Sequence, residues 1–262
     1  MNEFFGLRKI APLVRSYALP DASFDPRGEW HHRYTMFPIR YLTLASCGTF
    51  DIRRTNLEDT FKLKMVTDRD ALSGFRHFTA AELICEKNNP LSTPLKWTSH
   101  VKTAKTKDSP AYQNTGMAKS AVYEGGRISF QTGRFSSSIP ASGPFACKTA
   151  LFDAAQRLSV DAKPLTFDYM DEYDQLGGAR TLRYRGTYDV QMNTGKEPLS
   201  CFIETGAGSP PVSYWRDSPG RLLFWISGLM IYVLTEENGL KIQCELKTNT
   251  VRRAQKEAEA SQ

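Results

Sequence analysis

The sequence predicts a mainly β protein. It should be built on one large, strongly curved antiparallel sheet, a half-barrel or open barrel with meander topology and one or two helices packed on it. Three observations predict this fold: period-two alternation of apolar and polar residues in several segments, glycine-containing dipeptides between those segments, and only two segments with helical spacing. Of the 262 residues, 40% are apolar and 24% are charged, which supplies a large core and excludes a collagen-like or largely disordered chain.

Residues 1–40 are expected to form an N-terminal segment with a short amphipathic helix and the first strand. The apolar residues of this helix recur at helical spacing: Leu7, Ile10, Leu13, Val14 and Tyr17. We expect them to dock on a sheet rather than lie at a membrane surface, because the segment is short and only modestly basic. Arg8, Lys9 and Arg15 interrupt the apolar run, so no signal-peptide core is predicted.

Residues 41–250 are expected to form a single antiparallel β-domain. The alternation is cleanest between residues 181 and 192, where one face carries Leu182, Tyr184, Gly186, Tyr188, Val190 and Met192. Shorter segments repeat it, with inward positions at Phe61, Leu63, Met65, Ile128, Phe130, Leu240, Ile242, Cys244 and Leu246. These segments therefore predict strands that are buried on one face.

Tight turns are predicted between the strands. Gly125-Gly126 and Asn238-Gly239 supply the positive φ values that type I′ hairpin turns require. Residues 218–220, Ser-Pro-Gly, separate two further strands, and Gly228 marks either a turn or a bulge. Residues 199–247 therefore predict a β-meander, in which neighbours in sequence are neighbours in the sheet.

The second predicted helix covers residues 147–160 and follows the helix-breaking Gly143-Pro144. Its apolar residues recur at helical spacing and would lie across a sheet face. Residues 103–116 and 134–144 lack periodicity, so we expect exposed loops there. The polar tail, residues 251–262, has no apolar face and is expected to be a frayed helix or disordered.

No cofactor or metal site is expected from the motifs. The five cysteines are far apart in sequence and odd in number, so they predict buried thiols rather than a disulfide framework. One acidic cluster is a candidate for metal binding or acid–base catalysis: Asp168, Asp171, Glu172 and Asp174. Its spacing does not match a calcium loop, because Tyr173 stands where glycine is needed. A solvated turn is therefore the favoured interpretation.

Charge and hydropathy argue against a nucleic-acid interface and against a membrane-spanning helix. The net charge is +6, but the basic residues are scattered and few aromatic residues lie among them, so no nucleic-acid interface is predicted. The longest apolar run, residues 222–234, has thirteen residues, whereas a membrane-spanning helix needs about twenty. No transmembrane segment is therefore expected.

Aromatic residues crowd the final meander: Phe202, Tyr214, Trp215, Phe224, Trp225 and Tyr232. Residues 222–234 are apolar on both strand faces, so something must cover the second face. The cover could be the helix at 147–160, the N-terminal segment, a protein partner or an apolar ligand. We take the six aromatic residues as a candidate site for an apolar small molecule or lipid.

The segment from Pro211 to Gly239 resembles the C-terminal part of a group of uncharacterised bacterial β-rich proteins, which are similar to the periplasmic lipoprotein-carrier (Lol-type) half-barrels. The elements that carry the resemblance are Pro211, Val212, Tyr214, Trp215, Asp217, Gly220 and residues 222–226, together with residues 48–54. The resemblance extends over about residues 41–246. It implies a curved sheet whose concave apolar face is crossed by helices and can hold an acyl chain, and it carries over no catalytic residues.

The sequence therefore predicts a non-enzymatic binding or scaffold protein that holds an apolar ligand or lipid on the concave face of the sheet. Two alternatives remain open: a hydrolase that uses the acidic cluster, and a partner-binding subunit of an envelope assembly. The N-terminus as written predicts a cytoplasmic protein, whereas the family resemblance implies a periplasmic or envelope location.

Overall fold

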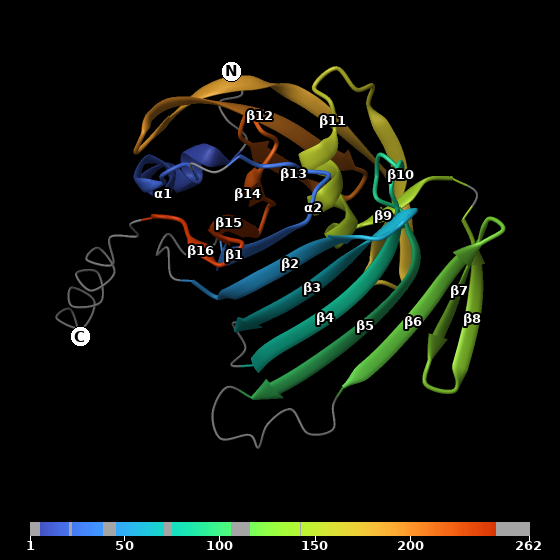
Figure 1. Cartoon of the computed structure of the whole chain (residues 1–262). Coiled ribbons are helices and arrows are strands. Elements are labelled where there is room, and N and C mark those ends of the chain that lie inside the picture. Colours follow the sequence, from blue (N-terminus) through green and yellow to red (C-terminus); the bar gives the residue numbers. More distant parts are fainter. Residues whose placement is uncertain are drawn as a thin grey trace.

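The computed structural model describes residues 6–20, 23–38, 46–70, 75–105, 116–141 and 143–244 (Figure 1). Within these ranges, sixteen strands form one sheet. The first eight are β1 (Trp30–Pro38), β2 (Gly48–Asn56), β3 (Thr60–Asp70), β4 (Phe75–Glu86), β5 (Pro94–Lys105), β6 (Met117–Glu124), β7 (Arg127–Thr132) and β8 (Phe135–Pro140). The others are β9 (Phe145–Cys147), β10 (Leu165–Asp171), β11 (Gln175–Met192), β12 (Gly195–Gly206), β13 (Ser209–Arg216), β14 (Leu222–Ile226), β15 (Met230–Glu237) and β16 (Leu240–Lys241).

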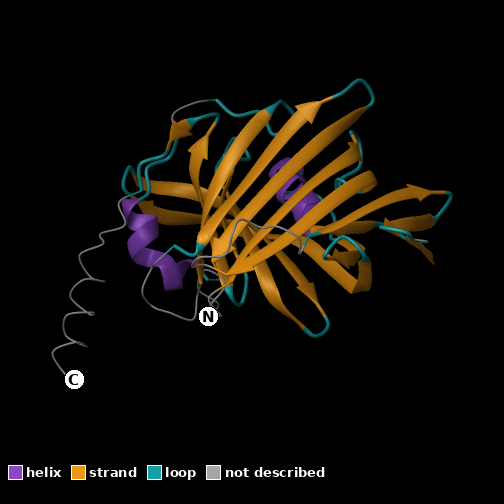
Figure 2. Ribbon diagram, turned by 90° about the horizontal axis from the view of Figure 1, so that it is seen from below, coloured by secondary structure: helices purple, strands orange, loops and turns teal. Residues whose placement is uncertain are grey.

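The sheet consists of two antiparallel meanders, β1–β8 and β10–β15, joined by pairing of β1 with β15. The short β9 extends the second meander and is parallel to β10. In Figures 1 and 2 the sheet curves around α2 (Lys148–Arg157), and β6–β8 project away from the rest; we call these three strands the β6–β8 extension. The predicted fold class, one large, open, curved antiparallel sheet with two helices, is confirmed.

Local patterns predicted several elements correctly. Along residues 181–192 the predicted inward positions are buried or partly buried, whereas Arg183, Arg185 and Asp189 are exposed. The inward positions do not share one face as predicted, because a register shift after Tyr184 leaves Tyr184 beside Phe202 and places Tyr188 beside Trp215, on the opposite face. Gly125 and Gly126 have φ values of +57° and +73° and connect β6 to β7, as a type I′ turn requires. Gly228 lies in the turn between β14 and β15, which decides between the two predicted alternatives.

Two local predictions were wrong. The segment 134–144 contains strand β8 instead of being only a loop, because β8 pairs with β7 although its Ser-rich sequence shows no alternation. Strand β16 ends at Lys241, and Leu240 is 72% exposed instead of facing inward, because β16 pairs only with the end of β15. Leu246 and the tail 251–262 lie outside the described residues, as does most of the predicted loop 103–116.

The two helical segments cover opposite faces of the final meander. Residues Leu7–Ile10 form a 3₁₀ turn that runs into α1 (Ala11–Ser16), and the predicted apolar face of this segment is buried. Tyr17 follows α1 and its ring contacts Phe224 of β14 at 5.1 Å. On the other face, the ring of Phe152 in α2 lies 5.8 Å from that of Trp225. The second apolar face is thus covered by the chain itself.

No described helix has the length and apolar character needed to cross a membrane. The domain boundaries suggested by the sequence, at residues 40 and 250, stay a prediction.

Candidate functional site

A buried ion cluster fixes α2 on the concave face of the sheet. The carboxylate of Asp153 accepts hydrogen bonds from Arg54 Nη1, Arg157 Nε and Ser92 Oγ, each at 2.6 Å. Arg54 lies on β2 and Ser92 on the loop between β4 and β5, so one carboxylate ties the helix to two parts of the first meander. Phe61 supports the cluster, because the Arg54 guanidinium stacks 3.7 Å from its ring centroid.

The two ends of α2 differ in their partners. At the C-terminal end, Arg216 Nη1 donates to the carbonyls of Ala155 and Gln156, at 3.0 and 2.9 Å. This is a favourable position for a cation. At the N-terminal end, no side chain caps the helix, no acidic residue lies in the first turn, and the first residue is Lys148. The positive end of the helix dipole therefore coincides with a cationic side chain, an arrangement that favours a nearby anion.

The amino group of Lys148 lies among aromatic rings from three strands. Its Nζ is 4.2 Å from the ring centroid of Tyr232, 4.9 Å from that of Trp225 and 5.5 Å from that of Phe50. Lys148 also donates a hydrogen bond to the Tyr232 hydroxyl. Its side chain is partly exposed, whereas the three aromatic residues are buried. We call these four residues the Lys148 site.

A polar network borders the Lys148 site. Tyr214, whose ring is 6.4 Å from that of Trp225, donates to Glu204 Oε2 at 2.6 Å. Glu204 forms an ion pair with Arg180, which stacks 3.5 Å over the ring of Tyr169. Burial, together with the Glu204 carboxylate, raises the pKa of Tyr214 well above its usual range, so its proton stays in this hydrogen bond. The carboxylate of Glu204 is thus already paired.

The indole N–H of Trp225 is buried. It faces the Tyr214 hydroxyl and by itself would lower the pKa of that group, but its geometry falls short of a full hydrogen bond to any described atom. A buried donor without an acceptor destabilises a folded protein by about 1–3 kcal/mol. Trp225 is only 7% exposed and lies beside the amino group of Lys148. Two hydrogen-bond donors, one of them cationic, therefore lie together at the N-terminus of α2.

The concave face continues from the Lys148 site towards the first meander. Phe50 pairs with Thr67, Thr67 with Thr79, and Thr79 with Val101, so these residues lie in one row on the same face. Phe50 is buried, but the other three are partly exposed. This row, with threonine methyl groups and valine, forms a mostly apolar surface next to a cation.

The structure divides the six predicted aromatic residues between two faces. The register pairs Phe202 with Tyr214, Tyr214 with Trp225, and Trp225 with Tyr232, and places these four on the face of α2. Trp215 and Phe224 pair with each other on the opposite face, near Tyr17. All six are buried. Only Trp225 and Tyr232 contact the Lys148 amino group.

The acidic cluster does not converge on one point. Asp168 lies within β10, Asp171 and Glu172 are exposed at the turn after it, and Asp174 forms a 2.5 Å ion pair with Lys119. Among the described residues, no three histidine, cysteine, aspartate or glutamate side chains come close enough to hold a metal ion. The turn instead directs Tyr173 inward, where its carbonyl accepts from Trp97 Nε1 at 3.0 Å. The hydrolase alternative stays a prediction without geometric support.

The cysteines of the sequence are free thiols. Burial raises the pKa of Cys147 to about 11 and that of Cys201 to about 12, so both stay protonated at neutral pH. Neither has the lowered pKa of a nucleophilic cysteine.

A second buried network closes the sheet where β1 meets β15. His32 Nε2 lies 3.2 Å from Glu237 Oε1, which also accepts from Arg221 Nε at 2.9 Å. Arg221 Nη1 donates to Asp217 Oδ2 at 2.6 Å. Burial lowers the pKa of His32. Burial alone would raise the pKa of Glu237, but hydrogen bonds from His32 and Arg221 outweigh the effect of burial and lower this pKa. The His32 ring stacks on Trp30 at 4.7 Å, so this network is part of the core.

Lys148 was missed in the sequence, where it is one basic residue before an amphipathic helix. Its partners come from β2, β14 and β15, and only the curvature of the sheet brings them to the helix terminus. The one available signal was a lysine, instead of an acidic or capping residue, at the start of a helix that follows a buried strand.

No protein-family model and no curated protein sequence matches the chain. Among solved structures, the chain is similar to a beta-barrel-like protein of Domain of Unknown Function DUF1849 from Brucella abortus. The two share 11% sequence identity, with a TM-score of 0.53 over 87% of this chain and 99% of the other. This likeness shows the fold alone and supports the resemblance to uncharacterised bacterial β-rich proteins. The closer resemblance to Lol-type carriers is not confirmed.

Proposed function

We propose that this protein is a non-enzymatic binding protein that holds an amphipathic ligand, an acyl chain with an anionic head group, on the concave face of its sheet. The head group would lie against Lys148, and the acyl chain would follow the row Thr67, Thr79 and Val101. The observation that supports this most directly is the lysine at the positive end of α2, surrounded by three aromatic rings; beside it lies the buried N–H of Trp225, whose hydrogen bond to the Tyr214 hydroxyl is geometrically poor.

The chemistry of the site favours a carboxylate over a neutral head group. A carboxylate would accept hydrogen bonds from Lys148 and Trp225, and its charge would offset that of the lysine and of the helix terminus. Glu204 is the nearest described carboxylate of the bordering network, but it is already paired with Arg180 and Tyr214. A hydrogen bond to a charged group contributes about 1.5–3 kcal/mol, or roughly a tenfold to hundredfold change in affinity.

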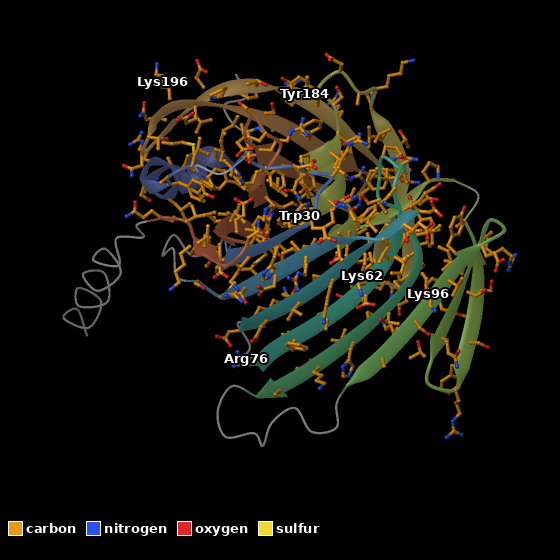
Figure 3. The ribbon with its side chains drawn as sticks, viewed as in Figure 1. Trp30, Lys62, Arg76, Lys96, Tyr184 and Lys196 are labelled. Carbon is orange, nitrogen blue, oxygen red and sulfur yellow. The ribbon has the colours of Figure 1, made fainter. Side chains whose placement is uncertain are left out.

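The proposal can be tested with two ligands that differ only in the head group and carry bromine next to it, 2-bromododecanoate and 2-bromododecan-1-ol. Bromine quenches tryptophan emission, so titration reports both affinity and location. We expect Lys148→Met to weaken binding of the acid about tenfold or more and to leave binding of the alcohol unchanged. Lys196→Met, at the exposed end of β12 near the top of Figure 3, is the matched control and should change neither.

Two tryptophan variants locate the ligand. Trp225→Phe should remove most of the quenching, whereas Trp215→Phe, on the opposite face of the same sheet, should leave it in place. Equal loss of affinity for acid and alcohol in Lys148→Met, or quenching that follows Trp215, would refute the proposal.

A further inference from the structure

The last strand of the β6–β8 extension has an unpaired edge. β8 pairs with β7 on one side, and no described strand pairs with its other side. Five of its six residues are exposed, and Phe135 is 76% exposed. Natural sheets usually protect such an edge with charged side chains, a bulge or a covering segment. β8 has no charged residue between Phe135 and Pro140, and its three serines leave the backbone accessible.

The turn before β8 fixes which backbone groups point to the free edge. Gly133 has a φ of +59° in a two-residue loop that joins Thr132 to Phe135. The pair that closes such a loop exchanges both of its hydrogen bonds, and the pairs then alternate along the strands. The N–H groups of Ser136 and Ser138 therefore point outward, towards the free edge. Pro140, the next position in this series, has no N–H, so it ends the edge there.

The two faces of β8 differ in chemistry. Ser136 and Ser138 lie on the outer face, where Arg127 Nε donates to Ser138 Oγ at 3.3 Å. On this face β5–β8 line a groove of about 560 Å³, and Lys96 is the charged residue in its lining, with no carboxylate among the others. Figure 3 shows Lys96 beside the extension. On the inner face, Phe135 and the partly exposed Ile139 share a side with the buried Ile128.

We propose that β8 binds an extended segment of a partner protein by strand addition, and that this segment alternates acidic and apolar residues. Main-chain hydrogen bonds would form with Ser136 and Ser138. Acidic side chains of the added strand would lie on the outer face, towards the guanidinium of Arg127, which reaches the Ser138 hydroxyl, and apolar side chains would cover Phe135 and Ile139 on the inner face. Successive side chains of a strand point to opposite faces, so one peptide can make the acidic contacts on the outer face and the apolar contacts on the inner face.

A labelled synthetic peptide with alternating valine and glutamate tests this proposal by fluorescence anisotropy. A peptide of the same composition in two blocks, and one that alternates valine and lysine, are the controls. We expect the alternating glutamate peptide to bind at least tenfold more tightly than either. The double variant Ser136→Pro/Ser138→Pro should abolish the difference, because it removes the two outward donors while leaving the β7–β8 hydrogen bonds in place.

A second variant separates loss of binding from loss of folding. Arg127→Glu should reverse the preference towards the valine–lysine peptide, which an unfolded extension could not do. Thermal unfolding of each variant checks that the sheet is intact. Equal binding of alternating and block peptides, or unchanged affinity in the folded proline variant, would overturn the proposal. A dimer detected by sedimentation would also overturn the proposal if the proline variant were monomeric, because a second copy of the chain would then occupy the edge of β8.

Discussion

The two meanders of the sheet differ in how many of their faces are covered. In the second, α2 packs on the concave face and the segment from Leu7 to Tyr17 on the other, and β14 is buried at every position. In the first, β3 alternates between buried and exposed residues, and β8 has no fully buried residue. A strand with two covers becomes a continuous apolar run, whereas a strand with one cover keeps its alternation.

This difference assigns folding stability mainly to the second meander and the open binding surfaces to the first. The doubly covered meander has buried side chains on both of its faces, and it supports the Lys148 site from one side. The first meander contributes the partly exposed row on the concave face, the groove on the outer face and the free edge of β8. Substitutions in the second meander should therefore reduce folding stability, and matched substitutions in the outer strands of the first should not.

The largest effect is expected where α2 joins the two meanders. Asp153→Ala leaves the buried guanidinium groups of Arg54 and Arg157 without their shared carboxylate, which should lower the free energy of unfolding by about 5 kcal/mol. Asp51→Ala removes one of the two carboxylate partners of Arg33, which is 43% exposed and keeps Glu236, and should cost at most about 1 kcal/mol. Urea denaturation of both variants measures the difference. Similar losses would mean that the buried cluster is not what holds α2.

A matched pair of phenylalanines compares the meanders directly. Phe224→Ala empties a fully buried position between the sheet and Tyr17, and should destabilise by about 3–4 kcal/mol. Phe135→Ala, at the exposed edge strand, should change stability by less than about 0.5 kcal/mol. Thermal unfolding of the two variants is the measurement. A large loss for Phe135→Ala would show that β8 is covered in solution.

The phase of β11 is tested by two adjacent residues. Tyr188 is half-buried and its ring lies 5.7 Å from that of Trp215, whereas Asp189 faces solvent. Tyr188→Asp brings a charge into this contact and should destabilise by about 2 kcal/mol. Asp189→Asn should change little. Equal effects in chemical denaturation would contradict the assigned strand phase.

Sequence patterns predicted what is local in this molecule. The alternation of buried and exposed residues from Leu182 to Met192 and the Gly125-Gly126 turn each depend on a few neighbouring residues, and both were predicted correctly. The register shift after Tyr184, which moves Tyr188 to the opposite face, was not predicted. The pairing of β1 with β15 and the parallel pairing of β9 with β10 depend on segments far apart in the chain, and no local pattern encodes them. β8 was missed because its edge position places no requirement for apolar residues on its serines.

The candidate site shows the same division. The aromatic crowding of the second meander was visible as composition, and the need for a cover on its second face followed from it. Which aromatic residues share a face with Lys148 depends on the register and on the curvature around α2. The two features that carry chemistry, a lysine at a helix terminus and a buried indole N–H with a poorly placed acceptor, appear only when three strands and a helix are placed together.

The smallest predicted effect is a pH dependence that belongs to the contact between β1 and β15. Burial holds the pKa of His32 below its usual value of 6.5, so the unfolded chain binds the proton first as the pH falls. The contribution of His32 to stability is therefore complete above about pH 6.5 and declines below it, by at most about 1.4 kcal/mol per pH unit. The lowered pKa of Glu237 also makes stability fall as the pH falls, but only below about pH 4.5. Burial raises the pKa of Asp217, so protonation of Asp217 makes stability rise as the pH falls.

Comparison of variants between pH 7 and pH 5 separates the contribution of His32 from those of the other titrating groups. Urea midpoints of the parent protein should fall over this range, and those of His32→Gln should fall less, because glutamine cannot take up the proton. His100→Gln, at a partly exposed position on β5, is the control and should keep the slope of the parent protein. If His100→Gln removed the slope and His32→Gln did not, the pH dependence would originate in the open meander instead of at the contact that joins the two.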